Sequence, residues 1–490
     1  MKTYIGIDLG TSSVKILLVN SDGAILKSVS REYPISYPQS GWSEQSPLDW
    51  YNATMNGLKE LLSDADRESV SGISFGGQMH GLVILDENDE VIRPAILWND
   101  GRTAKQTAYL NEVIGEDTLM EYTANIAFAG FTAPKILWVK ENEPENFARI
   151  EKLMLPKDYL AYRLSGTYAT DYSDASGMLL LDVKNRTWSK KMCEICGIDV
   201  NKLPTLYESY EKIGTLLPSV ALELGLSEDV LVAIGAGDNA AAAVGTGTVG
   251  DSQCNISLGT SGTVFISQEK FAKNECGALH NFCHSSGAYH LMGCILSAAS
   301  CNKWWVEDVL GTSDFKREED GMLNMLGCGS VFFLPYLMGE RTPHNDVNAR
   351  GAFIGMRPDT TRKQLTMAVL EGVAFALRDS VELAKQLGAK IEITSICGGG
   401  AKSEVWRNIV ANVLGIPVTR PLVEEGPAYG ASILAMVADG EYKTVKDATK
   451  KLIKLRDTTM PNKEITALYE RKYQIFKRLY PQLKEIYKEF

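Results

Sequence analysis

The chain is predicted to be an α/β protein of two lobes, with mixed sheets flanked by helices. With 490 residues it is long for a single hydrophobic core. Apolar, β-branched stretches alternate with segments of helical periodicity along the whole chain. The tetrapeptide Leu-Gly-Thr-Ser begins at Leu9 and again at Leu258, each time between two predicted strands. This repeat at half-chain distance indicates a duplicated lobe.

Composition narrows the class of protein. Hydrophobic residues make up 45% of the chain and charged residues 23%, which is typical of globular proteins. The net charge of −11 argues against nucleic acid or an anionic membrane surface as main partner. No apolar run reaches the roughly 18 residues that span a bilayer, and the first residues do not resemble a signal peptide. Nine scattered cysteines are typical of reduced thiols, so we expect a cytoplasmic enzyme.

The first lobe is predicted to begin with a hairpin over residues 3–20, whose turn is Leu-Gly-Thr-Ser-Ser, and a third strand over residues 24–33. A helix over residues 46–64 follows, because Ser46 suits the N-cap and a proline suits the first helical position. Its apolar side chains, Trp50, Met55, Leu58, Leu61 and Leu62, fall near one face.

The second lobe is predicted to begin with a similar hairpin over residues 251–268. Residues 391–418 read as strand, glycine turn, helix and strand, with the helix ending at Gly415. The lobes are expected to cover residues 1–245 and 246–490. At the end of the chain we expect a pair of amphipathic helices around Pro481, with the terminal helix docked back on the protein.

The first turn can bind phosphate. A Gly-Thr-Ser turn between strands exposes N–H groups and hydroxyls, which can surround phosphate oxygens. Asp8 comes just before this turn and can hold Mg²⁺ through water, since Mg²⁺ keeps several waters and takes few carboxylates. Lys15 adds a positive charge or lies on the solvent side of its strand. An ordinary tight turn is the alternative, but its second copy at Leu258 favours a clamp for a polyphosphate.

Two further candidate binding or catalytic sites lie in segments that are rich in small residues. Cys-Gly-Gly-Gly at residues 397–400 allows close approach of a flat or charged group, or else of a packed helix. It matches neither the G-x-G-x-x-G nor the G-x-x-x-x-G-K-[ST] pattern. Asp238 stands alone between small residues at a strand-to-helix junction. It either caps the helix that follows or acts as a general base toward a sugar hydroxyl.

A polar bend, Gly-Gly-Gln-Met-His-Gly at residues 76–81, lies between apolar strands and is predicted to line a pocket. A single histidine is as often structural as functional. Two other motifs are interpreted as packed interior residues. Cys193 and Cys196 lack a second ligand pair for zinc, and His280 and His284 lack the glutamate of a zincin motif.

These motifs resemble the FGGY carbohydrate kinases of the actin/hexokinase/Hsp70 superfamily. IGIDLGTSSVK resembles the first phosphate motif, NISLGTSGTVFIS the second and ICGGGAKSEVWRNIVANVLGIPV the adenosine motif. GPAYGASILAMVADG resembles the second connecting helix, and GFTAPKILWVKEN and GAFIGMRPDTTRKQLTMAVLEG resemble two family signatures. The resemblance implies two actin-like (ribonuclease H-like) lobes with a catalytic cleft between them.

Strings such as SFGGQMHGLVILDE and FLPYLMGERTPHND resemble the members of the family that phosphorylate D-xylulose to D-xylulose 5-phosphate. ATP and Mg²⁺ are then the implied cofactors, with Asp238 as base and Asp8 as the residue that organises Mg²⁺. The implied sugar contacts are Gln78, Met79, His80 and Asn239. The implied nucleotide contacts are Thr11, Ser12, Lys15, Gly259, Thr260, Gly399 and Gly400.

Three alternatives stay open at this point. The first is another FGGY kinase, for ribulose, gluconate, glycerol or another polyol. The second is an actin- or Hsp70-like ATPase that needs no sugar, and the third is a sugar sensor without activity, which the presence of both Asp8 and Asp238 disfavours. The sequence leaves open whether the chain forms a homodimer.

Overall fold

The computed structural model describes residues 1–274 and 277–490. Their contacts divide the chain into two compact units. Unit 1 comprises Met1–Val249, Asn281–Tyr289 and Glu425–Ile453, and unit 2 comprises Gly250–His280, His290–Glu424 and Lys454–Phe490. Two segments from the second half of the chain therefore belong to unit 1, which a single boundary after residue 245 does not describe.

A mixed sheet forms the centre of unit 1, with the strand order β13-β14-β5-β1-β2-β3 and with β15 also paired to β5. Its strands are β1 (Thr3–Leu9), β2 (Ser13–Asn20), β3 (Ile25–Glu32), β5 (Val70–Gly77), β13 (Lys212–Thr215), β14 (Leu231–Ala233) and β15 (Ala236–Gly237). β1, β2 and β3 form an antiparallel meander, whereas β5 runs parallel to β1. The predicted hairpin at the start of the chain and the third strand are confirmed.

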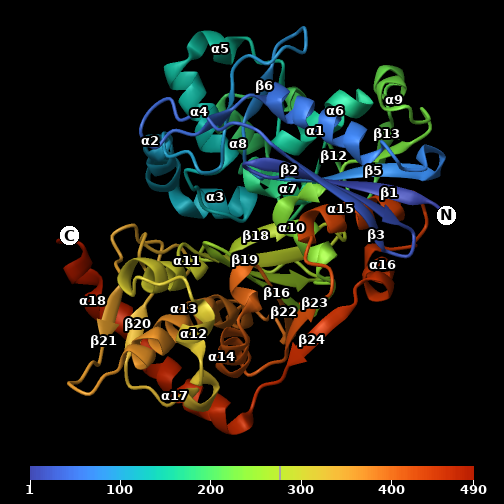
Figure 1. Cartoon of the computed structure of the whole chain (residues 1–490). Helices are drawn as coiled ribbons and strands as arrows, with labels where there is room; N and C mark the ends of the chain where they lie inside the picture. Colours follow the sequence, from blue (N-terminus) through green and yellow to red (C-terminus); the bar gives the residue numbers. More distant parts are fainter. Residues whose placement is uncertain (275–276) are drawn as a thin grey trace. The chain divides into compact units, whose positions relative to one another are not determined.

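Helices cover both faces of this sheet. α1 (Pro47–Leu61) packs through Gly57 against Ile16 of β2. On the other face, α15 (Gly426–Ala438) contacts β1 and β5, and Figure 1 shows this red helix beside the blue strands. A Cβ atom at Gly6 would overlap the carbonyl of Ala428, so only glycine permits this approach. α10 (Asp238–Gly245) packs in turn on α15.

Shorter elements complete unit 1. The strands are β4 (Glu44–Gln45), β6 (Val83–Leu85), β7 (Ala95–Ile96), β8 (Lys152–Met154), β9 (Ala169–Asp171), β10 (Leu181–Asp182), β11 (Thr187–Trp188) and β12 (Thr205–Tyr207). The helices are α2 (Ala104–Ala108), α3 (Glu116–Thr123), α4 (Thr132–Asn142), α5 (Pro144–Ala148), α6 (Pro156–Ser165), α7 (Tyr172–Ala175), α8 (Lys190–Cys196), α9 (Pro218–Leu224) and α16 (Val445–Leu452).

Unit 2 repeats the strand pairing of unit 1. Its sheet contains the order β19-β17-β16-β22-β23-β24. The strands are β16 (Ser252–Leu258), β17 (Gly262–Gln268), β19 (Tyr289–Ile295), β22 (Ile391–Cys397), β23 (Val418–Pro421) and β24 (Leu455–Thr459). β16 is antiparallel to β17 and parallel to β22, just as β1 is antiparallel to β2 and parallel to β5. The predicted duplication of the hairpin is confirmed.

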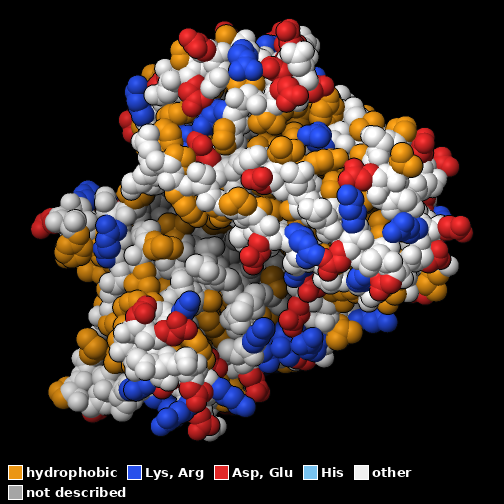
Figure 2. All heavy atoms as spheres, turned by 45° about the horizontal axis from the view of Figure 1, so that its top comes forward, with side chains coloured by type: hydrophobic (Ala, Val, Ile, Leu, Met, Phe, Trp, Pro, Cys, Tyr) orange, Lys and Arg blue, Asp and Glu red, His pale blue; other side chains and the backbone are white. Residues whose placement is uncertain are grey.

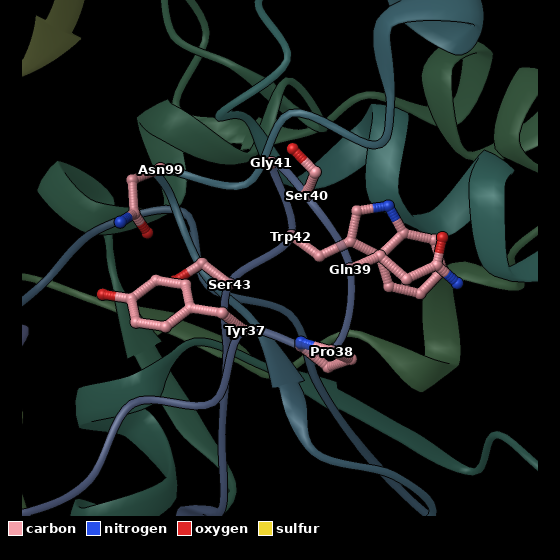
Figure 3. A pocket seen from close by; sticks show the side chains of 8 residues that line it. All are labelled: Tyr37, Pro38, Gln39, Ser40, Gly41, Trp42, Ser43 and Asn99. Atoms are coloured by element: carbon pink, nitrogen blue, oxygen red, sulfur yellow. The ribbon is translucent and has the colours of Figure 1, made fainter.

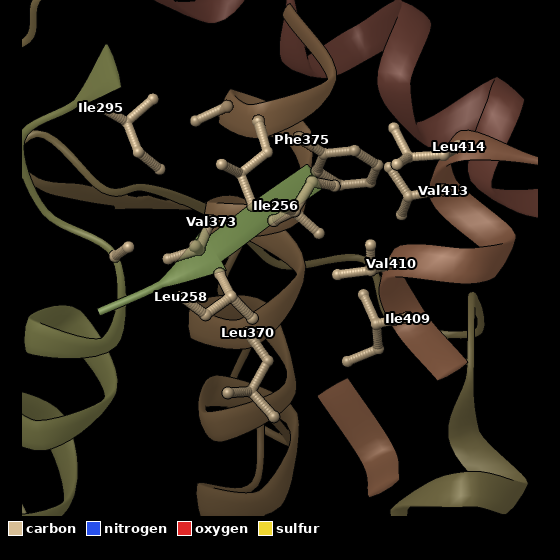
Figure 4. Close-up of a cluster of buried hydrophobic side chains, with 14 of the residues drawn as sticks. Ile256, Leu258, Ile295, Leu370, Val373, Phe375, Ile409, Val410, Val413 and Leu414 are labelled. Carbon is tan, nitrogen blue, oxygen red and sulfur yellow. The ribbon is translucent and has the colours of Figure 1, made fainter. Parts of the chain in front are cut away.

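The helices of unit 2 enclose a large apolar core. The longest is α13 (Arg362–Gln386), whose N-cap Thr361 and Gln364 form a capping box. Figure 4 shows how Ile256 and Leu258 of β16 lie among side chains of α13 and of α14 (Glu404–Leu414). The remaining elements of unit 2 are β20 (Phe332–Leu334), β21 (Ala352–Ile354), α11 (Ala299–Lys303), α12 (Phe315–Glu319), α17 (Lys463–Phe476) and α18 (Leu479–Tyr487). β18 (His280–Cys283) belongs mostly to unit 1, which includes Asn281–Tyr289. The second hairpin thus starts from a strand whose apolar side chains are buried in this core.

The terminal helices differ from the prediction in one respect. The break between α17 and α18 lies at residues 477–478, and Pro481 lies inside the first turn of α18. The predicted pair of helices is confirmed, but the break between them precedes Pro481. Proline is tolerated in the first turn of a helix, because the N–H groups there have no partner within the helix. Tyr469 and Phe476 of α17 pack on Phe375, as expected for docked helices.

Charged residues are interspersed on the surface. The face drawn in Figure 2 mixes acidic and basic side chains. Exposed ion pairs such as Lys59–Glu223 occur on the surface. Exposed pairs of this kind contribute up to about 1 kcal/mol each. The two apolar cores therefore carry the stability of the fold. No helix of the described residues is both long enough and apolar enough to cross a membrane.

Candidate active site

The turn between β1 and β2 is held by its carbonyl groups. The Gly10 carbonyl accepts from the Tyr33 hydroxyl, the Thr11 carbonyl from Gln45 Nε2 at 2.7 Å, and the Ser12 carbonyl from the Tyr33 N–H at 3.2 Å. The Thr11 hydroxyl accepts from Trp98 Nε1 at 2.9 Å. Because the carbonyls are engaged by the protein, the turn is left to present N–H groups and hydroxyls, as a phosphate site requires.

Asp8 lies near the end of β1, on the face that α15 covers. Its cross-strand partner is Lys15, so both side chains stand on the same face. Lys15 Nζ lies 2.6 Å from Oε2 of Glu425, the residue before α15. Burial, and next the charge of Asp238, raise the pKa of Asp8 to about 7; Lys15 opposes this rise and Glu425 adds to it. Asp8 is therefore a carboxylate among other carboxylates, with one cation close by.

Asp238 is the first residue of α10, directly after the N-cap Gly237. Its Oδ1 accepts from the backbone N–H of Asn239 at 2.7 Å and from Asn239 Nδ2 at 3.2 Å. Burial raises the pKa of Asp238 to about 6, and the hydrogen bond from the Asn239 N–H opposes part of this rise. The positive end of the α10 dipole also favours the carboxylate form. Asp238 is thus ionised at neutral pH and is still a usable base.

A buried ionic cluster is connected to Gly237, the residue before Asp238. Lys157 Nζ is 2.6 Å from Asp158 Oδ1 and 2.9 Å from Asp171 Oδ1, and none of these side chains is exposed. Asp171 Oδ2 accepts from the Ser173 hydroxyl, whose oxygen accepts the Gly237 N–H at 3.2 Å. The cluster therefore fixes the residue that precedes Asp238. The sequence predicts no role for this cluster, although the charged residues in Pro-Lys-Asp and Asp-Tyr-Ser-Asp were visible signals.

The predicted sugar-binding loop follows β5, which lies beside β1. The Gln78 N–H donates to the Leu9 carbonyl at 2.8 Å, so this loop and the first turn share one edge of the sheet. Met79 is buried and packs on Gly237, next to Asp238. The structure thus brings Asp8, Asp238, Gln78 and Met79 to the same region of unit 1.

His80 has an unusual and well-supported backbone. Its φ angle is +70°, in the left-handed region, which costs free energy for a residue other than glycine. Lys135 Nζ at 2.8 Å and Thr132 Oγ1 at 3.1 Å both donate to the His80 carbonyl. His80 Nδ1 lies 2.8 Å from the Gly177 carbonyl, and a side chain at position 177 would overlap the imidazole. Strain held in place by such contacts is typical of functional sites.

The second turn, in unit 2, is held in a similar way. The Gly259 carbonyl accepts from the Ala299 N–H at 2.8 Å, and the Thr260 carbonyl accepts from the Ala298 N–H and the Ser300 hydroxyl at 2.9 and 2.7 Å. Again the carbonyls are engaged by the protein. Thr260 is exposed, so its hydroxyl is available to a ligand.

The glycine triplet lies beside this second turn. Side chains at Gly398 or Gly400 would meet Leu258 of β16, so these two glycines allow close packing within the protein. A Cβ atom at Gly399 would meet no described atom within 4 Å. Gly398 and Gly400 therefore serve packing, whereas the exposed Gly399 is not required by any packed neighbour among the described residues.

A surface pocket of about 580 Å³ lies along residues 37–43 in unit 1. Figure 3 shows Tyr37 and Asn99 on one side of it and Trp42 on the other. The pocket wall is attached to the loop that carries Trp98, since the Gly41 and Ser43 carbonyls accept from backbone N–H groups of that loop. Its lining residues are all uncharged.

The two motifs that were interpreted as packed interior residues lie in buried segments. Cys193 and Cys196 both belong to helix α8 and are buried. Burial raises the pKa of the Cys193 thiol to about 11 and that of the Cys196 thiol to about 12. His280 and His284 are buried too, but β18 rather than a helix carries the segment between them. Within the described residues, no cluster of three or more His, Cys, Asp or Glu could hold a metal ion. Cys276 lies outside the described residues.

Turns that present N–H groups and hydroxyls, together with an isolated carboxylate, are features that phosphoryl transfer to a hydroxyl compound can use. The N-terminal domain of the FGGY family of carbohydrate kinases matches residues 3–245, and the C-terminal domain of that family matches residues 254–438. The chain therefore belongs to the FGGY family of carbohydrate kinases.

Individual relatives agree with this assignment. The chain is 41% identical to Xylulose kinase of Escherichia coli K12, over 98% of this chain and 99% of that protein. It is 38% identical to the crystal structure of a xyloylose kinase from Brucella ovis, with a TM-score of 0.93 over 99% of this chain and 100% of that one. Gluconate kinase from Lactobacillus acidophilus has a TM-score of 0.94 over 100% of this chain and 99% of its own, but at 24% identity it shows the fold alone.

Proposed function

We propose that this chain transfers the γ-phosphoryl group of ATP to D-xylulose and so forms ADP and D-xylulose 5-phosphate. The observation that carries the proposal is the 41% identity to Xylulose kinase of Escherichia coli, which extends over 98% of this chain. A match of this length includes both turns, the loop over residues 76–81 and Asp238. It therefore concerns the sugar side of the reaction as well as the nucleotide side.

Asp238 is the proposed base. In the transfer, the terminal hydroxyl of the sugar loses its proton to Asp238, and its oxygen forms a bond to the γ-phosphorus. The bond between that phosphorus and the bridging oxygen of ADP breaks. Phosphoryl transfer depends more on positioning the nucleophile than on removing its proton early. A carboxylate fixed at a helix N-terminus, with a pKa of about 6, suits this task.

Asp8 is proposed to hold Mg²⁺, mostly through water, and the bound ion would neutralise phosphate charge. The donor set fits this ion. Asp8 stands among carboxylates whose charges, after burial, raise its pKa, and a divalent cation would relieve that repulsion. Lys15 is already paired with Glu425, so we propose that it acts on Asp8 rather than directly on a phosphate.

The two turns are proposed to bind phosphate oxygens, through Thr11 and Ser12 in unit 1 and through Gly259 and Thr260 in unit 2. The support is that their carbonyl groups are engaged by the protein, as described above. Gly399 and Gly400 are proposed to lie against the adenosine, and the open space at Gly399 supports this.

Gln78, Met79, His80 and Asn239 are the proposed sugar contacts. Met79 packs beside Asp238 through Gly237, and the Asn239 side chain donates to the Asp238 carboxylate. The strained backbone at His80, which hydrogen bonds from Thr132 and Lys135 hold in place, supports a binding role because such strain is concentrated at functional sites.

A panel of sugars tests the proposal. ADP release would be measured with D-xylulose, D-ribulose, gluconate and glycerol at equal concentrations, and without any sugar. We expect kcat/KM for D-xylulose to exceed the others by at least about tenfold, because transition-state contacts decide selectivity. A higher value for another sugar would assign the chain to a different branch of the family. Equal ADP release with and without sugar would favour a sugar-independent ATPase.

A further inference from the structure

The side-chain amide of Gln45, in the short strand β4, makes four hydrogen bonds. Its side chain is buried, with 2% of the residue exposed. Nε2 donates to the Thr11 carbonyl at 2.7 Å and to the Pro34 carbonyl at 3.3 Å. Oε1 accepts from Trp50 Nε1 at 3.0 Å and from Gln78 Nε2 at 3.1 Å. Two donors and two acceptors use the full capacity of one amide group.

Trp50 determines the orientation of this network. An indole N–H can only donate, so the atom of Gln45 that faces it is the oxygen. The nitrogen of Gln45 must then face the Thr11 carbonyl, which can only accept. For the same reason Gln78 turns its nitrogen toward Gln45. Each amide orientation therefore follows from the one before it, beginning at a fully buried tryptophan.

The far end of the network is an acceptor without a donor. Gln78 Oε1 is buried and makes no hydrogen bond within the described part of the chain. A buried polar atom of this kind is costly unless a ligand or a water molecule satisfies it. The proposed sugar carries several hydroxyl groups, and each of them can donate to such an oxygen directly or through one water.

We propose that Gln45 is a positioning residue that couples the sugar-binding loop at residues 76–81 to the first phosphate-binding turn. A donor that binds to Gln78 Oε1 fixes the orientation of the Gln78 amide. The hydrogen bond from Gln78 then fixes the Gln45 amide, which in turn holds the Thr11 carbonyl. The N–H groups of the turn are thereby better ordered for phosphate. Sugar and nucleotide then each bind more tightly in the presence of the other. This inference rests on the proposed function and adds a residue that touches neither substrate.

The test is a measurement of binding coupling by isothermal titration calorimetry. The Kd of D-xylulose would be measured with and without a non-hydrolysable ATP analogue and Mg²⁺. We expect the analogue to lower this Kd by about fivefold or more in the unaltered chain, and the reciprocal experiment to give the same factor. In Gln45→Leu the factor should fall to nearly one.

Three further variants make the result specific. Gln106→Leu is the matched control, because Gln106 is a buried glutamine of unit 1 whose amide binds Glu141 instead, and it should keep the full factor. Gln45→Glu keeps an oxygen that accepts from Trp50 and Gln78, but it cannot donate to the Thr11 carbonyl. This variant should therefore lose the coupling while its contacts to Trp50 and Gln78 remain. If Gln45→Leu does not fold, Trp50→Phe, which removes the donor that orients Gln45, should weaken the coupling.

Each outcome decides the inference. A coupling factor in Gln45→Glu equal to that of the unaltered chain overturns it, as does a factor of one in the unaltered chain. If D-xylulose does not bind to the unaltered chain, the proposed substrate is wrong. The same titrations are then run with the sugar that the panel identifies, and the inference stands or falls on them.

Discussion

Lys15 Nζ lies 2.6 Å from Oε2 of Glu425, although 410 residues separate the two in sequence. Lys15 stands opposite Asp8 in the first hairpin, and Glu425 directly precedes α15, the helix that returns to unit 1 from the second half of the chain. The pair therefore places one positive and one negative charge beside the carboxylate that is proposed to organise Mg²⁺.

Removing the charge of Lys15 and removing the charge of Glu425 should shift the pH dependence of kcat/KM in opposite directions. Burial and Asp238 raise the pKa of Asp8 to about 7, Lys15 lowers it and Glu425 raises it. Asp8 must be ionised to attract Mg²⁺, so activity is lost as the pH falls through its pKa. Lys15→Met should move the acid limb of kcat/KM to higher pH, and Glu425→Gln should move it to lower pH. Lys2→Met, which removes an exposed ion pair with Asp439, is the control. Shifts of the same sign in both variants would contradict this account.

Removing the buried ammonium at Lys157 should destabilise unit 1. Lys157→Met leaves Asp158 and Asp171 without their counter-charge, and breaking a buried pair in this way costs about 3–5 kcal/mol. Urea unfolding at pH 7 measures the loss. It should shrink as the pH falls, because burial raises the pKa of Asp158 and Asp174, so that both are protonated earlier than exposed carboxyls. The control Lys59→Met, in an exposed pair with Glu223, should cost less than about 1 kcal/mol. If Lys157→Met and Lys59→Met lost the same free energy of unfolding, the buried cluster would not depend on the charge of Lys157.

The second turn gives a prediction on the nucleotide side. The Ser300 hydroxyl donates to the Thr260 carbonyl at 2.7 Å, so Ser300→Ala should loosen the turn. We expect KM for ATP to rise about three- to tenfold, in line with one hydrogen bond of about 1 kcal/mol, while KM for D-xylulose changes less. Steady-state kinetics with each substrate varied in turn measures both values, and Ser313→Ala on the exposed loop nearby is the control. A larger effect on the sugar than on ATP would contradict the assignment of Thr260.

Local parts of the fold could be predicted because local sequence determines them. The two Leu-Gly-Thr-Ser turns, the helix after Pro47 and the helix that ends at Gly415 all carry their own start or stop signals. The return of Glu425–Ile453 to unit 1 has no local signal. It depends on glycines such as Gly6 meeting a distant backbone, and a single sequence does not show which segments meet.

The residues of the candidate site also fall into two groups, those that the sequence could identify and those that only the structure reveals. Asp8 and Asp238 could be chosen from the sequence because each is an isolated carboxylate among small or apolar residues. Gln45, Lys157 and Glu425 could not, because polar residues of these types are common and only their partners reveal a role. Gln45 is ordinary in sequence, and its amide becomes informative only when Trp50, Gln78 and Thr11 are seen around it.

The central claim is that Asp238 is the base for phosphorylation of the sugar, and Asp238→Asn tests it most directly. The side chain keeps its size, so the fold and the Kd of ATP should not change. ADP release with D-xylulose and Mg²⁺ should fall by about 10²- to 10⁴-fold. In the unaltered chain, kcat/KM should also decrease as the pH falls below the Asp238 pKa of about 6. An Asp238→Asn variant that still phosphorylates D-xylulose at more than about a tenth of the unaltered rate would contradict the claim.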